Sequence, residues 1–224
     1  MDSFIYFAAL LTFLFLLSKA LAQSVGSLVY AVTRSKKLAV STLALLFLPG
    51  TIIHEFAHAA VAQGLGVYVG DIEFTPKYDG ENVKLGSVQV ASTDPFRQFL
   101  IGIAPLIIGF VLIFLVFAIY DRFQINGLWP RVLLFYILFQ IGNTMFSSKR
   151  DMEGALELAI AIFVLLGLVY LISGKQVFVI ILNILNDLEP VFKMASGSLV
   201  KIILIDLAIV APSRFLTPAW RFSK

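Results

Sequence analysis

The 224-residue sequence contains no cysteine and only two histidines. The lack of cysteine excludes disulfide frameworks, thiolate metal sites and cysteine nucleophiles together. Charged residues are also scarce, at 14% of the chain against about 25% in an average soluble domain. The longest basic cluster is Arg34, Lys36 and Lys37, which is too short to indicate a nucleic-acid partner.

Hydrophobic residues make up 59% of the chain, whereas an average soluble domain has roughly 45–50%. They gather in stretches that hold no Asp, Glu, Lys or Arg: 3–18, 20–33, 38–53, 98–120, 132–148 and 158–174. Several of these stretches approach or exceed the roughly 18–20 residues that an α-helix needs to cross a bilayer. The composition therefore predicts an α-helical polytopic (multi-pass) protein embedded in the lipid bilayer of a cell membrane.

The pattern predicts one membrane-embedded domain over residues 1–224, with about six transmembrane segments and a core at 38–155. We expect a retained N-terminal helix rather than a cleaved signal peptide, because Asp2 stands where a signal peptide usually has positive charge. A kink is expected at Pro49-Gly50 because proline removes a backbone donor. The expected helical segments are 3–33, 38–63, 95–120, 131–147, 153–172 and a broken C-terminal segment at 176–210.

Residues 67–92 differ from the rest, because apolar and polar residues alternate on both sides of Asp79-Gly80. Asp-Gly between two alternating runs predicts a β-hairpin. An ordinary solvent loop is the alternative. An open sheet edge is tolerated at membrane depth only where protein or a water-filled cavity covers it. We therefore expect a β-ribbon that lies at the membrane interface or lines a cavity.

Both histidines lie in one short motif, His54-Glu55-Phe56-Ala57-His58, within a predicted helix. Residues four apart share a helical face, so the two imidazoles can converge on one metal ion while Glu55 lies beside them as a proton acceptor. Zinc suits this spacing, because it takes nitrogen and oxygen ligands and keeps one position open in catalytic sites. A polar cluster kept for packing is the alternative. It is less favoured because an ionisable group at membrane depth costs about 2.5–3.5 kcal/mol on insertion scales and is by default a functional candidate.

A third protein ligand must be a carboxylate, because the sequence has no third histidine and no cysteine. If successive helices alternate in direction, the helix expected at 131–147 runs the same way as the helix that carries the motif. Its end then lies near the two histidines. The candidate ligands are Asp151 just past that end, its rivals Glu153 and Glu157 and, more weakly, Asp94 beside the ribbon.

Taken together, these features resemble the site-2 protease family of intramembrane zinc metalloproteases. The resemblance covers about residues 50–155. It rests on the HEFAH motif in a membrane helix and on the β-prone ribbon that follows it. It also rests on a helix with Gly102-Ile-Ala-Pro105-Leu106 and on Asn143 followed by Asp151 and Gly154.

The resemblance implies that Asp151 is the third zinc ligand. It also implies a contact between Asn143 and the substrate backbone, for which a helix-packing hydrogen bond is the alternative. The sequence departs from the family pattern at three places. It has Ala104-Pro105 and Ile108 where the family has Gly-Pro and an Asn, and Asp151-Met-Glu-Gly154 where the family has Asp-Gly. It also has Phe146-Ser-Ser-Lys-Arg150 where the family has prolines before the Asp.

The sequence thus predicts an intramembrane metalloendopeptidase in which His54, His58 and Asp151 hold Zn²⁺ and Glu55 is the general base toward a metal-activated water. The expected substrate is a transmembrane protein or peptide, which the ribbon could bind by strand addition. Two other interpretations stay open. One is a different multi-span HExxH metallopeptidase with Glu153 as third ligand, and the other is a catalytically inactive membrane scaffold that keeps the metal site.

The sequence says less about how a substrate reaches the site and about how the chain is oriented in the membrane. Pro49-Gly50 and the broken segment 176–210 are candidates for a gate. Basic residues divide almost evenly between the two expected membrane faces, so the positive-inside rule does not orient the chain. The family resemblance places the active site nearer the cytosolic side.

Overall fold

The computed structural model describes residues 2–79, 82–123, 126–146, 160–161, 163–172 and 174–216. Most of this described chain is helical. The helices are α1 (Asp2–Thr33), α2 (Lys36–Gly64), α3 (Pro95–Phe123), α4 (Leu128–Thr144), α6 (Lys175–Asp187) and α7 (Glu189–Leu216), with a further helical stretch at Phe163–Ile172. Between α2 and α3 lie four short strands: β1 (Val69–Glu73), β2 (Lys77–Asp79), β3 (Asn82–Lys84) and β4 (Ser87–Val90).

Among the described residues, four helices are long and apolar enough to cross a membrane: α1, α2, α3 over Pro95–Val116 and α7 over Glu189–Ser213. Helix α4, with 17 residues, is at the lower limit of the about 17–25 residues that spanning helices use, and α6, with 13, is below it. The prediction of a mainly helical chain with several long apolar helices is therefore confirmed. The described residues contain four candidate spans where the sequence predicted about six.

The boundaries of the first four helices agree with the expected ones to within a few residues. Helix α2 continues through Pro49 as one helix. The C-terminal segment is broken as predicted, because α6 ends at Asp187 and α7 begins at Glu189. Of the helix expected at 153–172, the structure describes 160–161 and 163–172, and these residues are helical.

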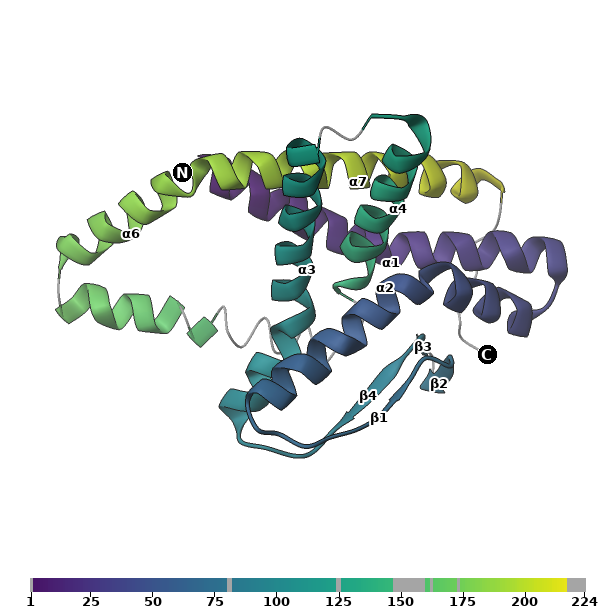
Figure 1. Ribbon diagram of the computed structural model, residues 1–224, viewed down its shortest axis with the longest axis horizontal. Helices are drawn as coiled ribbons and strands as arrows, with labels where there is room; N and C mark the ends of the chain where they lie inside the picture. The colour runs from purple at the N-terminus through teal and green to yellow at the C-terminus, as the bar shows by residue number, and fades with distance from the viewer. Residues whose placement is uncertain are drawn as a thin grey trace.

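Helices α1 and α7 lie side by side and run in the same direction (Figure 1). Both begin at one end of the molecule, where Ser3 Oγ donates a hydrogen bond to Glu189 Oε1 at 3.3 Å and Phe4 packs edge-on against Phe192. Helices α3 and α4 cross this pair, and α2 runs diagonally between the crossing and the ribbon (Figure 1). Helix α6 and Phe163–Ile172 project away from this bundle.

The apolar core lies where α1, α4 and α7 meet. Leu14 and Leu21 of α1 and Leu199 and Ile202 of α7 are almost fully buried. The rings of Phe47 and Phe139 stack at 6.0 Å and join α2 to α4. In a bilayer, close van der Waals packing of this kind, rather than exclusion of water, holds helices together.

The ribbon consists of two antiparallel strand pairs. Strand β1 pairs with β4, with Ile72 opposite Val88, and β2 pairs with β3, with Asp79 opposite Asn82. The predicted hairpin is therefore confirmed, and its connection at 80–81 lies outside the described residues. The ribbon lies along α2 (Figure 1).

Candidate metal centre

Helix α2 carries the HExxH motif in its last third. It begins at Ser35, whose Oγ accepts a hydrogen bond from the backbone N of Leu38 at 3.3 Å, as is typical of a helix N-cap. Helical geometry places His54 and His58 on one face and turns Glu55 by about 100° from His54 and about 60° from His58. All three side chains are buried, with exposed fractions of 4%, 7% and 8% for His54, Glu55 and His58.

The two imidazoles approach each other through the nitrogen atoms that a metal would bind. His58 Nε2 lies 3.2 Å from His54 Nε2, and the ring planes are nearly perpendicular, at 84°. Two nitrogens bound to one tetrahedral zinc ion, each at about 2.0–2.1 Å, are about 3.3–3.4 Å apart. The Nε2–Nε2 separation in this structure, which is also that of a hydrogen bond between the two rings, is close to this value.

A hydrogen bond to α3 sets the orientation of His58. Its Nδ1 lies 2.7 Å from the carbonyl oxygen of Ile101. A carbonyl oxygen only accepts, so Nδ1 carries the proton and Nε2 keeps the lone pair that a metal requires. A backbone carbonyl that holds the second ring nitrogen is the usual support of a metal-binding histidine.

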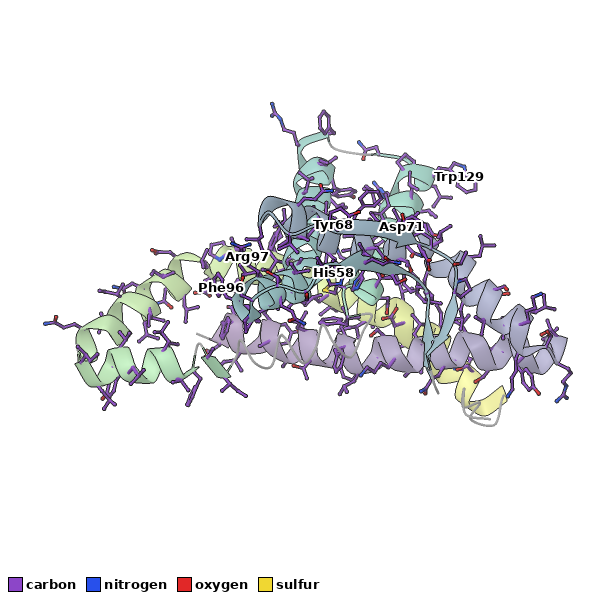
Figure 2. All side chains as sticks on the ribbon, turned by 90° about the horizontal axis from the view of Figure 1, so that it is seen from below. His58, Tyr68, Asp71, Phe96, Arg97 and Trp129 are labelled. Atoms are coloured by element: carbon purple, nitrogen blue, oxygen red, sulfur yellow. The ribbon has the colours of Figure 1, made fainter. Side chains whose placement is uncertain are left out.

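Glu55 faces the ribbon. A Cβ atom at Gly86, which precedes β4, would lie 3.2 Å from Glu55 Cγ and 2.6 Å from Thr51 Cγ2. The ribbon approaches α2 this closely because Gly86 has no side chain. The rings of Phe56 and Phe74 stack at 6.5 Å and extend the contact. Seen from below, the ribbon crosses the segment of α2 that holds His58, with Tyr68 and Asp71 on the ribbon (Figure 2).

His54 is enclosed by α3 and α4. A cavity of about 10 Å³ beside it is lined by Pro105 and Gly109 of α3 and by Ile141 and Thr144 of α4. This volume is about the smallest that holds a single water molecule. On this side of His54 the structure therefore leaves space for about one water molecule.

Contacts along these helices give their directions. His58 lies against Ile101 and His54 against Pro105, so α3 runs antiparallel to α2. The Gln140 side chain contacts Leu46, and Thr144 lies against Gly50, so α4 runs parallel to α2. The alternation of direction expected from the sequence is therefore confirmed for these three helices. The end of α4 lies beside His54.

The predicted third ligand, Asp151, lies outside the described residues, as do its rivals Glu153 and Glu157. Among the residues that the structure describes, no three His, Cys, Asp or Glu side chains gather closely enough to hold a metal ion. The identity of the third ligand therefore stays a prediction.

Asp94, the weaker candidate, caps α3. Its Oδ1 accepts a hydrogen bond from the backbone N of Arg97 at 3.1 Å, and Oδ2 lies 3.2 Å from Arg97 Nε. The hydrogen bond from the Arg97 backbone, with the neighbouring guanidinium, holds the pKa of the Asp94 carboxyl below its ordinary value. Asp94 followed by Pro95 is a favourable helix start, which accounts for this carboxylate without a metal.

Asn143, the predicted substrate contact, is buried between α4 and α7. Its Nδ2 donates hydrogen bonds to Phe139 O at 3.1 Å and to Asp206 Oδ1 at 3.0 Å. Both amide hydrogens are therefore engaged within the bundle. This geometry matches the alternative role of a helix-packing hydrogen bond.

Two polar residues of this region were missed by the sequence reasoning, Gln140 on α4 and Asp206 on α7. Both are almost fully buried, with exposed fractions of 1% and 0%. The sequence did contain a signal for each residue. An amide or a carboxyl inside a long apolar helix is energetically unfavourable in a membrane unless it has a hydrogen-bond partner. The partners, however, lie 63 to 94 positions away in the sequence.

Comparison of the chain with protein-family models, with curated proteins and with solved structures finds no match.

Proposed function

We propose that this protein is an intramembrane zinc metalloprotease, similar to site-2 proteases, that hydrolyses peptide bonds within or near transmembrane segments. The observation that carries the proposal is the pair of buried Nε2 atoms of His54 and His58, 3.2 Å apart, with the His58 ring oriented by the Ile101 carbonyl. Packing alone does not require two histidines at this spacing with a glutamate next to the first.

In this proposal His54, His58 and Asp151 hold the zinc ion. A bound zinc ion would lower the pKa of the attacking water and polarise the scissile carbonyl. Glu55 takes the proton of that water on its carboxylate and then delivers it to the leaving amine nitrogen. The ribbon against Glu55 and the enclosing helices at His54 restrict bulk water around this proton transfer.

The assignment of Asp151 is supported by the direction of α4. This helix runs parallel to α2 and ends beside His54. The chain therefore leaves α4 at the level of the two histidines, seven residues before Asp151. Glu153 remains the alternative ligand, as in another class of multi-span HExxH metallopeptidases.

The proposed substrate is an apolar membrane segment. Peptide bonds of such a segment are shielded as helix, so the segment must unwind locally before it reaches Glu55 and the two histidines. Strand β1 or β4 could take up the unwound segment as an added strand. A soluble peptide does not have to unwind from a helix at membrane depth, so it would not need this added-strand pairing.

The experiment compares the cleavage of a model transmembrane substrate by wild-type protein and by Glu55→Gln in reconstituted vesicles. We expect Glu55→Gln to lose cleavage by about 100-fold or more, because general acid–base catalysis contributes about 10²–10⁴-fold. Asp2→Asn, an exposed carboxylate at the start of α1, is the control and should cleave as wild type does. Cleavage by Glu55→Gln at the wild-type rate would contradict the proposal.

A scaffold without turnover is separated from a protease by the same pair of variants. A scaffold keeps its function in Glu55→Gln, and its wild type cleaves no substrate. The third ligand is tested by Asp151→Ala and Glu153→Ala, made separately. We expect only Asp151→Ala to lower the bound zinc.

A further inference from the structure

Helix α2 passes through Pro49 one turn before the metal-binding motif. Proline has no backbone N–H, and its ring crowds the carbonyl of the residue four positions earlier. A helix interrupted in this way usually bends at that turn, unless other groups satisfy the backbone. How α2 is held at this turn determines where His54 and His58 point.

The side chain of Gln140 on α4 reaches this turn. Its Nε2 donates a hydrogen bond to the Leu46 carbonyl oxygen at 2.7 Å, and its Oε1 accepts one from the Gly50 backbone N at 3.3 Å. These two backbone groups are the partners of each other in a regular α-helix, where the N–H of one residue bonds the carbonyl four residues earlier. The amide of Gln140 therefore bridges the helical backbone at the proline turn.

The backbone of α4 is pressed against α2 at the same turn. A Cβ atom at Gly50 would lie 2.8 Å from the Gln140 carbonyl oxygen and 2.6 Å from Thr144 Cγ2. A side chain at Gly50 would push α4 away and separate Gln140 from both backbone groups. These contacts all lie at one turn of α2. The residues that make up this turn and its contact with α4 are called the α2 clasp: Pro49, Gly50, Leu46 and Gln140.

We infer that Gln140 is a positioning residue for the metal centre. It fixes the course of α2 through Pro49 and the register of α4 against α2. The two histidines follow the clasp by one and two turns on α2, and the chain that continues from α4 leads to Asp151. The consequence for the metal rests on the proposed function, whereas the effect on α2 does not.

An amide suits this position because it offers one donor and one acceptor side by side. Leucine fills a similar volume with neither group. Gln140→Leu therefore removes the acceptor of the Gly50 N–H and the shorter of two hydrogen bonds to the Leu46 carbonyl, which also accepts one from Tyr136 Oη at 3.4 Å. In Gln140→Glu, burial at membrane depth disfavours the charged form and keeps the carboxyl protonated at neutral pH. A protonated carboxyl again offers one donor and one acceptor, so Gln140→Glu should behave much more like wild type than Gln140→Leu.

The structural test measures α2 directly. Because the chain has no cysteine, spin labels can be placed only at introduced positions, Leu38→Cys and Gln63→Cys, which are exposed on the two halves of α2. A straight helix would separate these Cα atoms by about 37 Å, and a bend at the clasp shortens this distance. We expect one narrow distance in the wild-type background and a shifted or broadened distribution with Gln140→Leu.

The functional test measures zinc affinity by competition with a chelator, and kcat and KM for the model transmembrane substrate. We expect Gln140→Leu to lower zinc affinity and kcat by about 10-fold or more, as is usual for the loss of a group that supports metal ligands, with KM unchanged. Gln23→Leu, an exposed glutamine on α1, is the matched control and should match wild type in every measurement.

An unchanged label distance and a zinc affinity within about twofold of wild type in Gln140→Leu would overturn the inference. If Gln140→Leu does not fold, Gln140→Met decides, because methionine has a similar length but no group that can donate to the Leu46 carbonyl: a shifted or broadened label distance supports the inference, and the wild-type distance overturns it. If wild-type protein binds no zinc, the proposed function fails. The label distances still decide the role of Gln140.

Discussion

Single side chains carry most of the chemistry proposed for this protein, because the chain offers very few that could. Both of its histidines lie on one face of α2, with Nε2 atoms 3.2 Å apart. Their burial means that each polar atom needs a partner, since an unsatisfied buried group costs about 1–3 kcal/mol. The Ile101 carbonyl supplies one such partner for His58.

The pair of Asn143 and Asp206 gives a first prediction at this scale. Asn143→Ala removes the donor to the fully buried Asp206 carboxyl. We expect a loss of about 1–2 kcal/mol in the free energy of unfolding in detergent and an unchanged KM, because the amide packs helices. Ser198→Ala, which removes a hydroxyl bonded within α7, is the control and should cost less. A raised KM with unchanged stability would instead assign Asn143 to the substrate.

Gly50 gives a second prediction. Gly50→Ala places a methyl group 2.6 Å from Thr144 Cγ2 and 2.8 Å from a backbone oxygen of α4, so we expect a destabilisation of about 1–3 kcal/mol from overpacking. Gly64→Ala on the same helix has no atom within 4 Å of the new Cβ and should leave stability unchanged or slightly raised. Equal stabilities of the two variants, measured by thermal unfolding, would refute the close approach of α4.

At the scale of elements, the ribbon packs closely against α2. Gly86 allows β4 to approach Glu55, and the aromatic pair Phe56 and Phe74 extends the contact. A displacement of about 1 Å at a catalytic group is enough to lower a rate by about 100-fold. The position of the ribbon therefore bears directly on the proton transfer proposed for Glu55.

A third prediction follows from this contact. Gly86→Val should push the ribbon away from Thr51 and Glu55 and lower cleavage by about 10-fold to 100-fold, while bound zinc is retained. Gly70→Ala on β1, whose Cβ would lie 3.3 Å from Gln89 Cβ, is the control in the same ribbon and should keep most of the activity. Wild-type cleavage by Gly86→Val would show that the ribbon has no part in the reaction.

The sequence allowed these elements to be predicted where their signals are local. Alternating residues around Asp79 predicted the hairpin, and the polar residues near Asp187 and Glu189 predicted the break between α6 and α7. The hydrogen bonding of α2 at the Pro49 turn was not predictable, because the group that donates to the Leu46 carbonyl is Gln140, 94 positions later in the sequence. Likewise, the partner of Asn143 depends on the packing of α7 against α4, which no local pattern encodes.

At the scale of the whole molecule, the helices expose many large apolar side chains. Leu16 on α1, Leu45 on α2 and Val111 on α3 are each more than half exposed. Soluble proteins rarely expose apolar patches of more than a few hundred Å², whereas a bilayer covers such surfaces. The sequence predicted this apolar character, but not the parallel pairing of α1 with α7 or the crossing of α3 and α4 over them.

A fourth prediction concerns orientation. If α2 spans the membrane, Val32 before it and Tyr68 after it lie on opposite faces, and both are strongly exposed. Single substitutions Val32→Cys and Tyr68→Cys in this cysteine-free chain should react with a membrane-impermeant maleimide from opposite sides, with Tyr68→Cys reacting from the cytosolic side. Labelling of both positions from one side would contradict a spanning α2.

The central claim is that His54, His58 and one carboxylate form a zinc site in which Glu55 is a base and not a ligand. The most direct measurement is the zinc content of purified wild type, Glu55→Gln and His58→Ala, determined after dialysis. We predict about one zinc per chain for wild type and Glu55→Gln, and a large loss for His58→Ala, because a catalytic site usually has three protein ligands. Equal zinc contents in wild type and His58→Ala, or no zinc in wild type, would contradict the account.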